Sequence, residues 1–154
     1  MKECVDLVSN FVPKDKVIVS TIDKYGNKEE SVSKGGIAQG MPLVVLIDGG
    51  TASASEIVAG AIRDYDLGTL VGTTSFGKGI VQVVLDKIGQ EKDGTALKVT
   101  ISKYYTPNGE NIHKKGIGPD VTVEYPKELK EKTYSRSTDP QFEKALEIIQ
   151  EKIK

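Results

Sequence analysis

Two residues that could act as a nucleophile and a base, Ser53 and Lys78, stand in one stretch of the chain, residues 42–82. An apolar run at residues 43–47 and a glycine turn precede Ser53, and a helical pattern follows it. A strand, turn and helix in this order can present a serine hydroxyl beside free helix N–H groups. Lys78 lies between two glycines and near apolar neighbours, where burial favours the neutral amine that a base requires. The pattern predicts a serine/lysine peptidase core.

Ser53 also has a structural interpretation. Together with Glu56 it has the spacing of a capping box, in which the serine only closes the N-terminus of a helix. Because such caps are common, the spacing alone favours this interpretation over catalysis. The residues by themselves therefore leave both roles of Ser53 open.

The glycines around Lys78 suggest a third interpretation, a phosphate-binding loop, because Gly72, Gly77 and Lys78 have the spacing of that motif. The motif requires serine or threonine after the lysine, but Gly79 stands there. A phosphate loop must also open a helix, whereas the composition of residues 80–85 is typical of a strand. We therefore exclude a nucleotide site on this loop.

Residues 49–82 resemble the active-site segment of the carboxyl-terminal processing proteases, also called tail-specific proteases. Their sequence is GGTASASEIVAGAIRDYDLGTLVGTTSFGKGIVQ. Residues 103–109, KYYTPNG, and residues 116–121, GIGPDV, also resemble this family. The resemblance therefore covers essentially the whole chain.

The resemblance implies a Ser/Lys(/Gln) site. Ser53 would be the nucleophile and Lys78 the general base. Gln82 would complete the site, and as an uncharged residue it could orient the amine without favouring its ammonium form. The backbone N–H of Ala54, directly after the nucleophile, is the natural donor to the oxyanion of the tetrahedral intermediate.

Two acidic residues also match the family pattern. We assign Glu56 to structure as a helix cap, and Asp64 to structure as a hydrogen-bonding anchor near the end of the same helix. The carboxylates lack metal-ligand spacing and no histidine cluster exists, so we expect no metal and no cofactor.

The expected fold is an α/β domain, and the resemblance implies a ClpP/crotonase-like arrangement of ββα units. Family members carry a PDZ domain upstream, followed by a strand and a glycine-rich turn, and neither segment has a counterpart here. We therefore expect a protease core that is incomplete at its N-terminal side. Such a fragment would have low activity or none, because a second oxyanion donor would come from the missing turn.

Periodicity predicts the elements of this core. Helices are expected at residues 3–12, from residue 57, and from Pro140 with Asp139 as its N-cap. The expected strands are residues 16–23, 28–33, 43–47, 69–71, 79–85, 97–105 and 121–123, with residues 43–47 as the central strand. The strand at 97–105 alternates apolar and polar residues, which predicts one wet face, and a polar loop at 89–94 precedes it.

We divide the chain into residues 1–126, a partial serine/lysine protease domain, and residues 127–154. The second part comprises a polar, solvated linker and a C-terminal helix that packs on the domain or extends from it.

Composition narrows the classes of partner. The 154 residues include 21 basic and 22 acidic side chains, a balance that gives no basis for nucleic acid or an anionic membrane as a partner. No apolar run approaches the roughly 20 residues of a membrane span, and no leader pattern is present. The sole cysteine, Cys4, is expected as a small buried thiol, and the sole histidine, His113, as a solvated loop residue outside the site.

The family resemblance implies a serine endopeptidase of the carboxyl-terminal processing type that cleaves proteins with apolar, flexible C-terminal tails. The substrate would bind as an added strand beside an exposed sheet edge. The family works outside the cytoplasm, at the cell envelope or in the periplasm, and homo-oligomerisation is left open. The alternative is a non-catalytic ligand- or peptide-binding module on the same fold, which would have no need for Ser53, Lys78 and Gln82 together.

Overall fold

The structure is a computed structural model that describes residues 1–86 and 94–154. All seven expected strands are confirmed, with ends that differ by at most one residue. The strands are β1 (Val17–Asp23), β2 (Lys28–Val32), β3 (Val44–Ile47), β4 (Thr69–Gly72), β5 (Ile80–Leu85), β6 (Leu97–Tyr105) and β7 (Val121–Thr122). The helices are α1 (Lys2–Ser9), α2 (Ala54–Asp64), α3 (Lys127–Lys130) and α4 (Pro140–Lys152), with a 3-10 turn at Arg136–Thr138.

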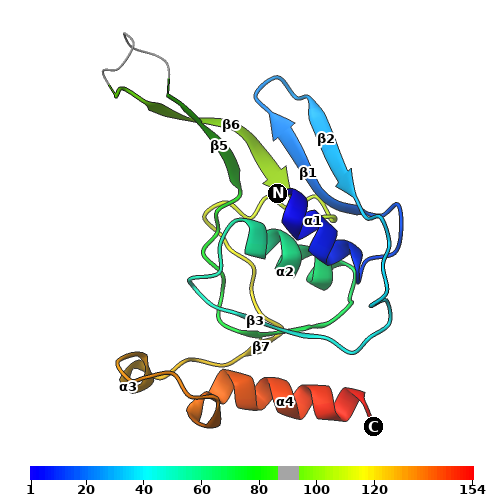
Figure 1. Cartoon of the computed structure of the whole chain (residues 1–154), viewed down its shortest axis with the longest axis vertical. Helices are drawn as coiled ribbons and strands as arrows, with labels where there is room; N and C mark the ends of the chain where they lie inside the picture. Colours follow the sequence, from blue (N-terminus) through cyan, green and yellow to red (C-terminus); the bar gives the residue numbers. More distant parts are fainter. Residues whose placement is uncertain (87–93) are drawn as a thin grey trace.

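The strands form two sheets (Figure 1). The first has the order β2-β1-β6-β5, and each neighbouring pair is antiparallel. The second has the order β3-β4-β7 and is parallel. The expectation that residues 43–47 form the central strand is wrong, because β4 lies between β3 and β7. The apolar run of β3 instead packs against α4.

The helices cover both sheets. In Figure 1, α1 and α2 lie between the β1–β2 hairpin and the second sheet, and α4 lies on the far side of that sheet. α2 contacts α1, β1 and β4, while α4 contacts β3 and β4. The core between these elements contains fully buried aliphatic side chains, among them Val8, Ile18, Ile62, Leu70, Ile112 and Ile117.

Small residues let α2 approach its neighbours closely. Ala59, Gly60 and Ala61 are all buried on this helix. A Cβ added at Gly60 would lie 3.1 Å from Cγ2 of Thr106, so the segment that follows β6 packs directly on the helix backbone. This close packing places the second half of α2 beside the segment that follows β6.

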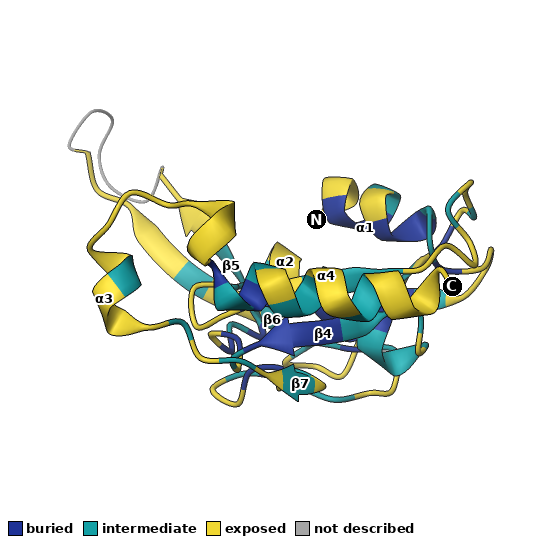
Figure 2. Cartoon of the chain, turned by 90° about the horizontal axis from the view of Figure 1, so that it is seen from below, coloured by how far each residue is buried: buried dark blue, intermediate teal, exposed yellow. Residues whose placement is uncertain are grey.

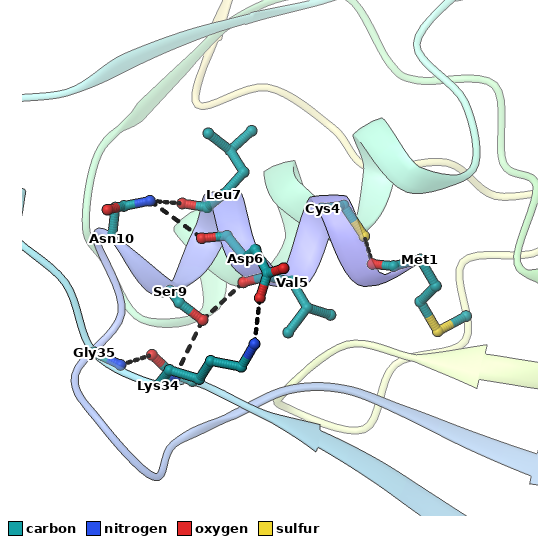
Figure 3. Close-up of polar contacts among 10 residues, drawn as sticks. Met1, Cys4, Val5, Asp6, Leu7, Ser9, Asn10, Lys34 and Gly35 are labelled. Atoms are coloured by element: carbon teal, nitrogen blue, oxygen red, sulfur yellow. Dashed lines mark hydrogen bonds and ion pairs between the residues drawn. The ribbon is translucent and has the colours of Figure 1, made fainter.

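The first helix ends earlier than the expected residues 3–12. The side-chain amide of Asn10 donates to the carbonyl oxygens of Asp6 (3.1 Å) and Leu7 (3.2 Å), as Figure 3 shows. These contacts satisfy carbonyls that lack a helical partner in the last turn, so α1 ends at Ser9.

Cys4 lies on the buried side of α1, which confirms the expectation of a small buried thiol. Its sulfur donates to the carbonyl oxygen of Met1 at 2.8 Å (Figure 3), and burial raises the pKa of the thiol. On the exposed side of α1, Lys34 Nζ lies 2.6 Å from Asp6 Oδ1 and ties the helix to the chain after β2.

β5 and β6 extend as a two-stranded ribbon beyond the rest of the sheet (Figure 1). The expectation of a single wet face on β6 is wrong, because Leu97 is 50% exposed and Ile101 is 46% exposed. β1 pairs with β6 only along residues 102–105, so the outer part of β6 has β5 alone beside it. The loop expected at residues 89–94 falls outside the described residues except for Gly94.

The C-terminal helix begins as expected. Asp139 is the N-cap of α4, and its Oδ1 accepts the backbone N–H groups of Gln141 (2.9 Å) and Phe142 (3.1 Å). The side chain of Gln141 donates to the carbonyl oxygen of Val123 at 2.8 Å, which joins the helix to the end of β7. The segment between them contains α3, mainly exposed in Figure 2, and the 3-10 turn, whose residues are also exposed.

Candidate active site

Ser53 stands on a sharp turn between β3 and α2. Asp48 stabilises the turn, because its Oδ1 accepts the backbone N–H groups of Gly50 (2.9 Å) and Thr51 (3.0 Å). Ser53 has φ 58° and ψ −116°, a backbone conformation that residues with a side chain rarely adopt. Ala54, the next residue, is the first of α2. The serine therefore stands at a strained elbow in front of a helix N-terminus, as the strand–turn–helix pattern predicts.

The carboxylate of Glu56 is fully buried and joins this elbow to the lysine turn. Oε2 accepts the backbone N–H groups of Ser53 (2.9 Å) and Lys78 (2.8 Å). Oε1 accepts the backbone N–H of Gly77 (2.7 Å) and the hydroxyl of Ser75 (2.5 Å). The contact to Ser53 is part of the capping box at the start of α2. The other three contacts reach a segment about twenty residues further along the chain.

A second loop, residues 111–117, holds the lysine turn from the other side. Ser75 and Ile117 bond twice, because the N–H of Ser75 donates to Ile117 O (3.0 Å) and the N–H of Ile117 donates to Ser75 Oγ (2.7 Å). The N–H of Lys114 donates to the carbonyl oxygen of Gly77 (2.8 Å). The side-chain amide of Asn111 donates to the carbonyl oxygen of Gly79 (3.1 Å). Backbone contacts therefore hold the turn on both sides of Lys78.

The two glycines beside Lys78 allow this close packing. Gly77 has φ +84°, and a Cβ there would lie 2.8 Å from the backbone nitrogen of Gly116. A Cβ at Gly79 would lie 2.7 Å from the backbone nitrogen of His113. Side chains at either position would thus collide with the backbone of the loop at residues 111–117.

One pocket brings the expected site residues together. It has a volume of about 410 Å³ and is lined by Ser53, Ala54, Lys78, Gln82 and Tyr104, together with Met1, Ile57, Ile80, Val81 and Lys98. A hollow of similar volume, about 430 Å³, lies between the β1–β2 hairpin and β6, away from the serine elbow and the lysine turn. Of the two, only the first is lined by Ser53 and Lys78, the residues that the sequence predicts as nucleophile and base.

The side chains of Ser53, Lys78 and Gln82 line the same pocket without pairing with one another in the part of the chain that the structure describes. Within the described residues, no hydrogen bond joins the Ser53 hydroxyl to the Lys78 amine. The side-chain nitrogen of Gln82 donates to Thr100 Oγ1 at 3.2 Å, across the β5–β6 ladder. Catalytic hydrogen bonds are often long or misaligned without substrate, so this geometry is compatible with the expected roles.

Asp64 lies at the far end of α2, outside the pocket. Its side chain is only 1% exposed, and Oδ1 accepts from the guanidinium of Arg63 at 2.8 and 2.9 Å. Oδ2 accepts the backbone N–H of Asn108 at 2.9 Å. These contacts tie the end of α2 to the turn after β6.

The sequence reasoning missed three polar residues of the site region. Ser75 and Asn111 hold the lysine turn, and Tyr104 lines the pocket. Tyr104 is 3% exposed, and its hydroxyl donates to the carbonyl oxygen of Ser53 at 3.2 Å. Burial, reinforced by the negative charge of Glu56, raises its pKa well above the usual range. Tyr104 lies in the KYYTPNG segment and Ser75 directly precedes FGKG, whereas Asn111 lies outside the segments that resemble the family.

His113 differs from the expected solvated residue. Its side chain is half-buried, and Nδ1 is buried without a hydrogen-bond partner among the described residues. Its backbone packs against Gly79, because the loop that carries it supports the lysine turn. The structure does not place His113 among the residues that line the pocket.

The described residues offer neither a metal-binding cluster nor a membrane-spanning helix. No group of three or more His, Cys, Asp or Glu side chains within residues 1–86 and 94–154 is arranged to hold a metal ion. Over the same residues, no helix has the length and apolar character that crossing a membrane requires.

Curated proteins similar to this chain are processing proteases. The carboxyl-terminal-processing protease of Synechocystis sp. is 39% identical over 145 residues, which is 94% of this chain and 33% of that protein. The carboxy-terminal processing protease CtpB of Bacillus subtilis is 39% identical over 121 residues, 79% of this chain and 24% of that protein. The chain therefore spans about a quarter to a third of the length of these relatives.

Solved structures and a family profile agree with these relatives. The photosystem II D1 C-terminal processing protease superposes with a TM-score of 0.71 at 36% identity, over 80% of this chain and 31% of that one. A putative S41 protease from Bacteroides fragilis shares the fold, with a TM-score of 0.72 at 14% identity over 96% of this chain and 41% of that one. The profile described as peptidase family S41 matches residues 1–123. The chain belongs to peptidase family S41, with the α/β fold of these proteases.

Proposed function

We propose that this chain forms the catalytic core of a serine endopeptidase of the carboxyl-terminal processing type, with Ser53 as nucleophile and Lys78 as general base. The observation that carries the proposal is the single pocket that Ser53, Lys78 and Gln82 share. These residues come from the elbow before α2, the turn before β5, and β5 itself. Membership of peptidase family S41 supports the same conclusion.

The first chemical step is acylation of Ser53. Its Oγ attacks the carbonyl carbon of the scissile peptide bond, and the hydroxyl proton passes to the amine of Lys78. The carbonyl oxygen becomes an oxyanion, to which the N–H of Ala54 donates. The C–N bond then breaks, and the Lys78 ammonium returns the proton to the leaving amine. The C-terminal part of the substrate leaves as a free peptide.

The second step hydrolyses the acyl-enzyme. Lys78 takes a proton from water, whose oxygen attacks the acyl carbon, and the proton then returns to Ser53 Oγ as the ester bond breaks. Gln82 lies within the same pocket and would orient the amine through its uncharged amide. This role requires its side chain to turn away from Thr100, with which it now pairs.

The walls of the pocket favour an apolar substrate segment. Ile57, Ile80 and Val81 line it beside the two catalytic side chains. β5 borders the pocket and is an edge strand of the first sheet, so its free edge could pair with an extended peptide that reaches Ser53. We therefore propose substrates with flexible, apolar C-terminal tails, encountered outside the cytoplasm as the family resemblance implies.

The test is cleavage of an unstructured protein with an apolar C-terminal tail. Because the chain spans about a quarter to a third of its relatives, we would assay it alone and within a protein of the relatives' length. Ser53→Ala and Lys78→Ala should each abolish cleavage without loss of folding. Ser55→Ala, an exposed position in the same helical turn, and Lys103→Ala, exposed on β6, are the matched controls and should leave cleavage intact.

The outcomes distinguish the candidate functions. Cleavage that depends on Ser53 and Lys78 supports the proposal, in either form of the protein. Cleavage by the longer form alone would show that the site needs residues from outside this chain, such as a second oxyanion donor. If both forms fold and neither cleaves, the alternative of a non-catalytic binding module is favoured. Full activity of Lys78→Ala would exclude the Ser/Lys mechanism.

A further inference from the structure

Tyr104 makes a contact that no catalytic step above uses. It lies near the end of β6, yet its hydroxyl reaches the carbonyl oxygen of Ser53 at 3.2 Å. The ring is buried in the wall of the pocket that holds Ser53 and Lys78. A buried tyrosine hydroxyl needs an acceptor, and this one donates to the carbonyl oxygen of Ser53, with the carboxylate of Glu56 also nearby.

That carbonyl belongs to the same peptide group as the N–H of Ala54. In a planar trans peptide the C=O and the N–H point in opposite directions, so a contact that holds one end also aims the other. A donor at the carbonyl oxygen also draws electron density toward that oxygen, which makes the N–H a stronger donor. Within the described residues, the N–H of Ala54 donates to no protein acceptor.

We propose that Tyr104 is a positioning residue of the oxyanion site, which holds and polarises the Ser53–Ala54 peptide from its carbonyl side. The inference rests on the proposed function, because it assigns the N–H of Ala54 to the oxyanion. Tyr104 itself does not touch the reacting atoms. It acts through the peptide group that follows the nucleophile.

Two features make Tyr104 suited to this role. First, burial and the nearby carboxylate of Glu56 keep the hydroxyl protonated, so it remains a donor throughout the working pH range. Second, the carbonyl of Ser53 also accepts the backbone N–H groups of Glu56 (3.0 Å) and Ile57 (3.1 Å) at the start of α2. Tyr104 is thus the one donor to this carbonyl from beyond the helix, within the described residues.

The other donors make Tyr104→Phe an informative variant. Phenylalanine keeps the buried ring, and the carbonyl of Ser53 keeps its two helical donors, so the variant leaves no buried acceptor unpaired. The control is Tyr105→Phe. Tyr105 is the next residue along β6, and it lines a different hollow, formed by residues of β1 and β6. Both variants should have the melting temperature of the wild type within a few degrees.

Kinetics provide the first measurement, in whichever form of the protein cleaves the apolar-tailed substrate. In Tyr104→Phe, kcat should fall about tenfold or somewhat less with KM unchanged, the loss expected for one hydrogen bond that matters mainly in the transition state. Binding of a peptide aldehyde, which forms a tetrahedral adduct with serine, should weaken by the same factor. Tyr105→Phe should change neither quantity. An unchanged kcat and aldehyde affinity in Tyr104→Phe would overturn the inference.

A second measurement does not depend on activity, so it separates failure of this inference from failure of the proposed function. The amide proton of Ala54 should resonate upfield of its wild-type position in the NMR spectrum of Tyr104→Phe, because the peptide is less polarised. In the spectrum of Tyr105→Phe, the Ala54 amide proton should resonate at its wild-type position. If the Ala54 resonance does not move in Tyr104→Phe, the positioning role is wrong, whether or not the protein cleaves its substrate.

Discussion

The buried carboxylate of Glu56 accepts the backbone N–H of Lys78 at 2.8 Å, through the same oxygen that accepts the N–H of Ser53. One oxygen atom therefore sets the spacing between the nucleophile's elbow and the turn of the base. Contacts between a carboxylate and N–H groups are stronger than those between neutral partners. A residue that the sequence indicates only as a helix cap thus links the two halves of the site.

Glu56→Gln is expected to disrupt this link. The amide can accept through one oxygen only, and its NH₂ group would face N–H donors that now bond to the carboxylate. The free energy of unfolding should fall by about 2–3 kcal/mol, and peptidase activity should fall with it. Chemical denaturation and the cleavage assay measure the two effects.

The matched control is Glu147→Gln on α4, where an exposed glutamate pairs with Lys144. Its free energy of unfolding should change by less than about 1 kcal/mol, because exposed ion pairs contribute little. Equal stability of Glu56→Gln and Glu147→Gln would contradict the role assigned to Glu56.

Gly79→Ala should displace the lysine turn. The added Cβ would lie 2.7 Å from the backbone nitrogen of His113, and backbone cannot move aside as a flexible side chain can. We expect a loss of about 1–3 kcal/mol in the free energy of unfolding, together with weaker cleavage. Gly118→Ala is the control, because a Cβ at Gly118 meets no atom within 4 Å. A fully stable and active Gly79→Ala variant would show that the turn is not held as described.

The contact between Asp6 and Lys34 should make stability depend on pH. The hydrogen bond from Lys34 lowers the pKa of the Asp6 carboxyl below its unfolded value of about 3.9. A group whose pKa is lowered by folding stabilises the protein above the unfolded pKa, and this contribution is lost as the pH falls through the folded pKa. Asp6→Asn should therefore be less stable than the wild type at pH 7, and the difference should shrink steadily below about pH 4.

Lys34→Met provides the control for this pH effect. It removes the partner, so Asp6→Asn made in that background should show little difference at either pH. Urea denaturation at a series of pH values would measure the effect of Asp6→Asn on the free energy of unfolding, both in the wild type and in the Lys34→Met background. A difference between wild type and Asp6→Asn that stays constant down to low pH would rule out the contact as its source.

The local features of this site could be read from the sequence. The strand, turn and helix around Ser53 involve neighbouring residues, so an apolar run, glycines and a small-residue helix were enough to predict the elbow. The cap of α4 is equally local, because Asp139 bonds to residues two and three positions away. The resemblance of residues 49–82 to the processing proteases added the roles that spacing alone left open between a cap and a nucleophile.

The tertiary structure decided what distant segments do to one another. Tyr104 reaches Ser53 across 51 positions, and Ile117 bonds to Ser75 across 42, distances over which no periodicity carries a signal. The exposure of the apolar side chains of β6 also depends on tertiary structure. Their alternation in the sequence could not show that β1 stops pairing with β6 at Ser102. A sequence pattern specifies what a segment can form, whereas burial and hydrogen-bond partners depend on which other segments pack against it.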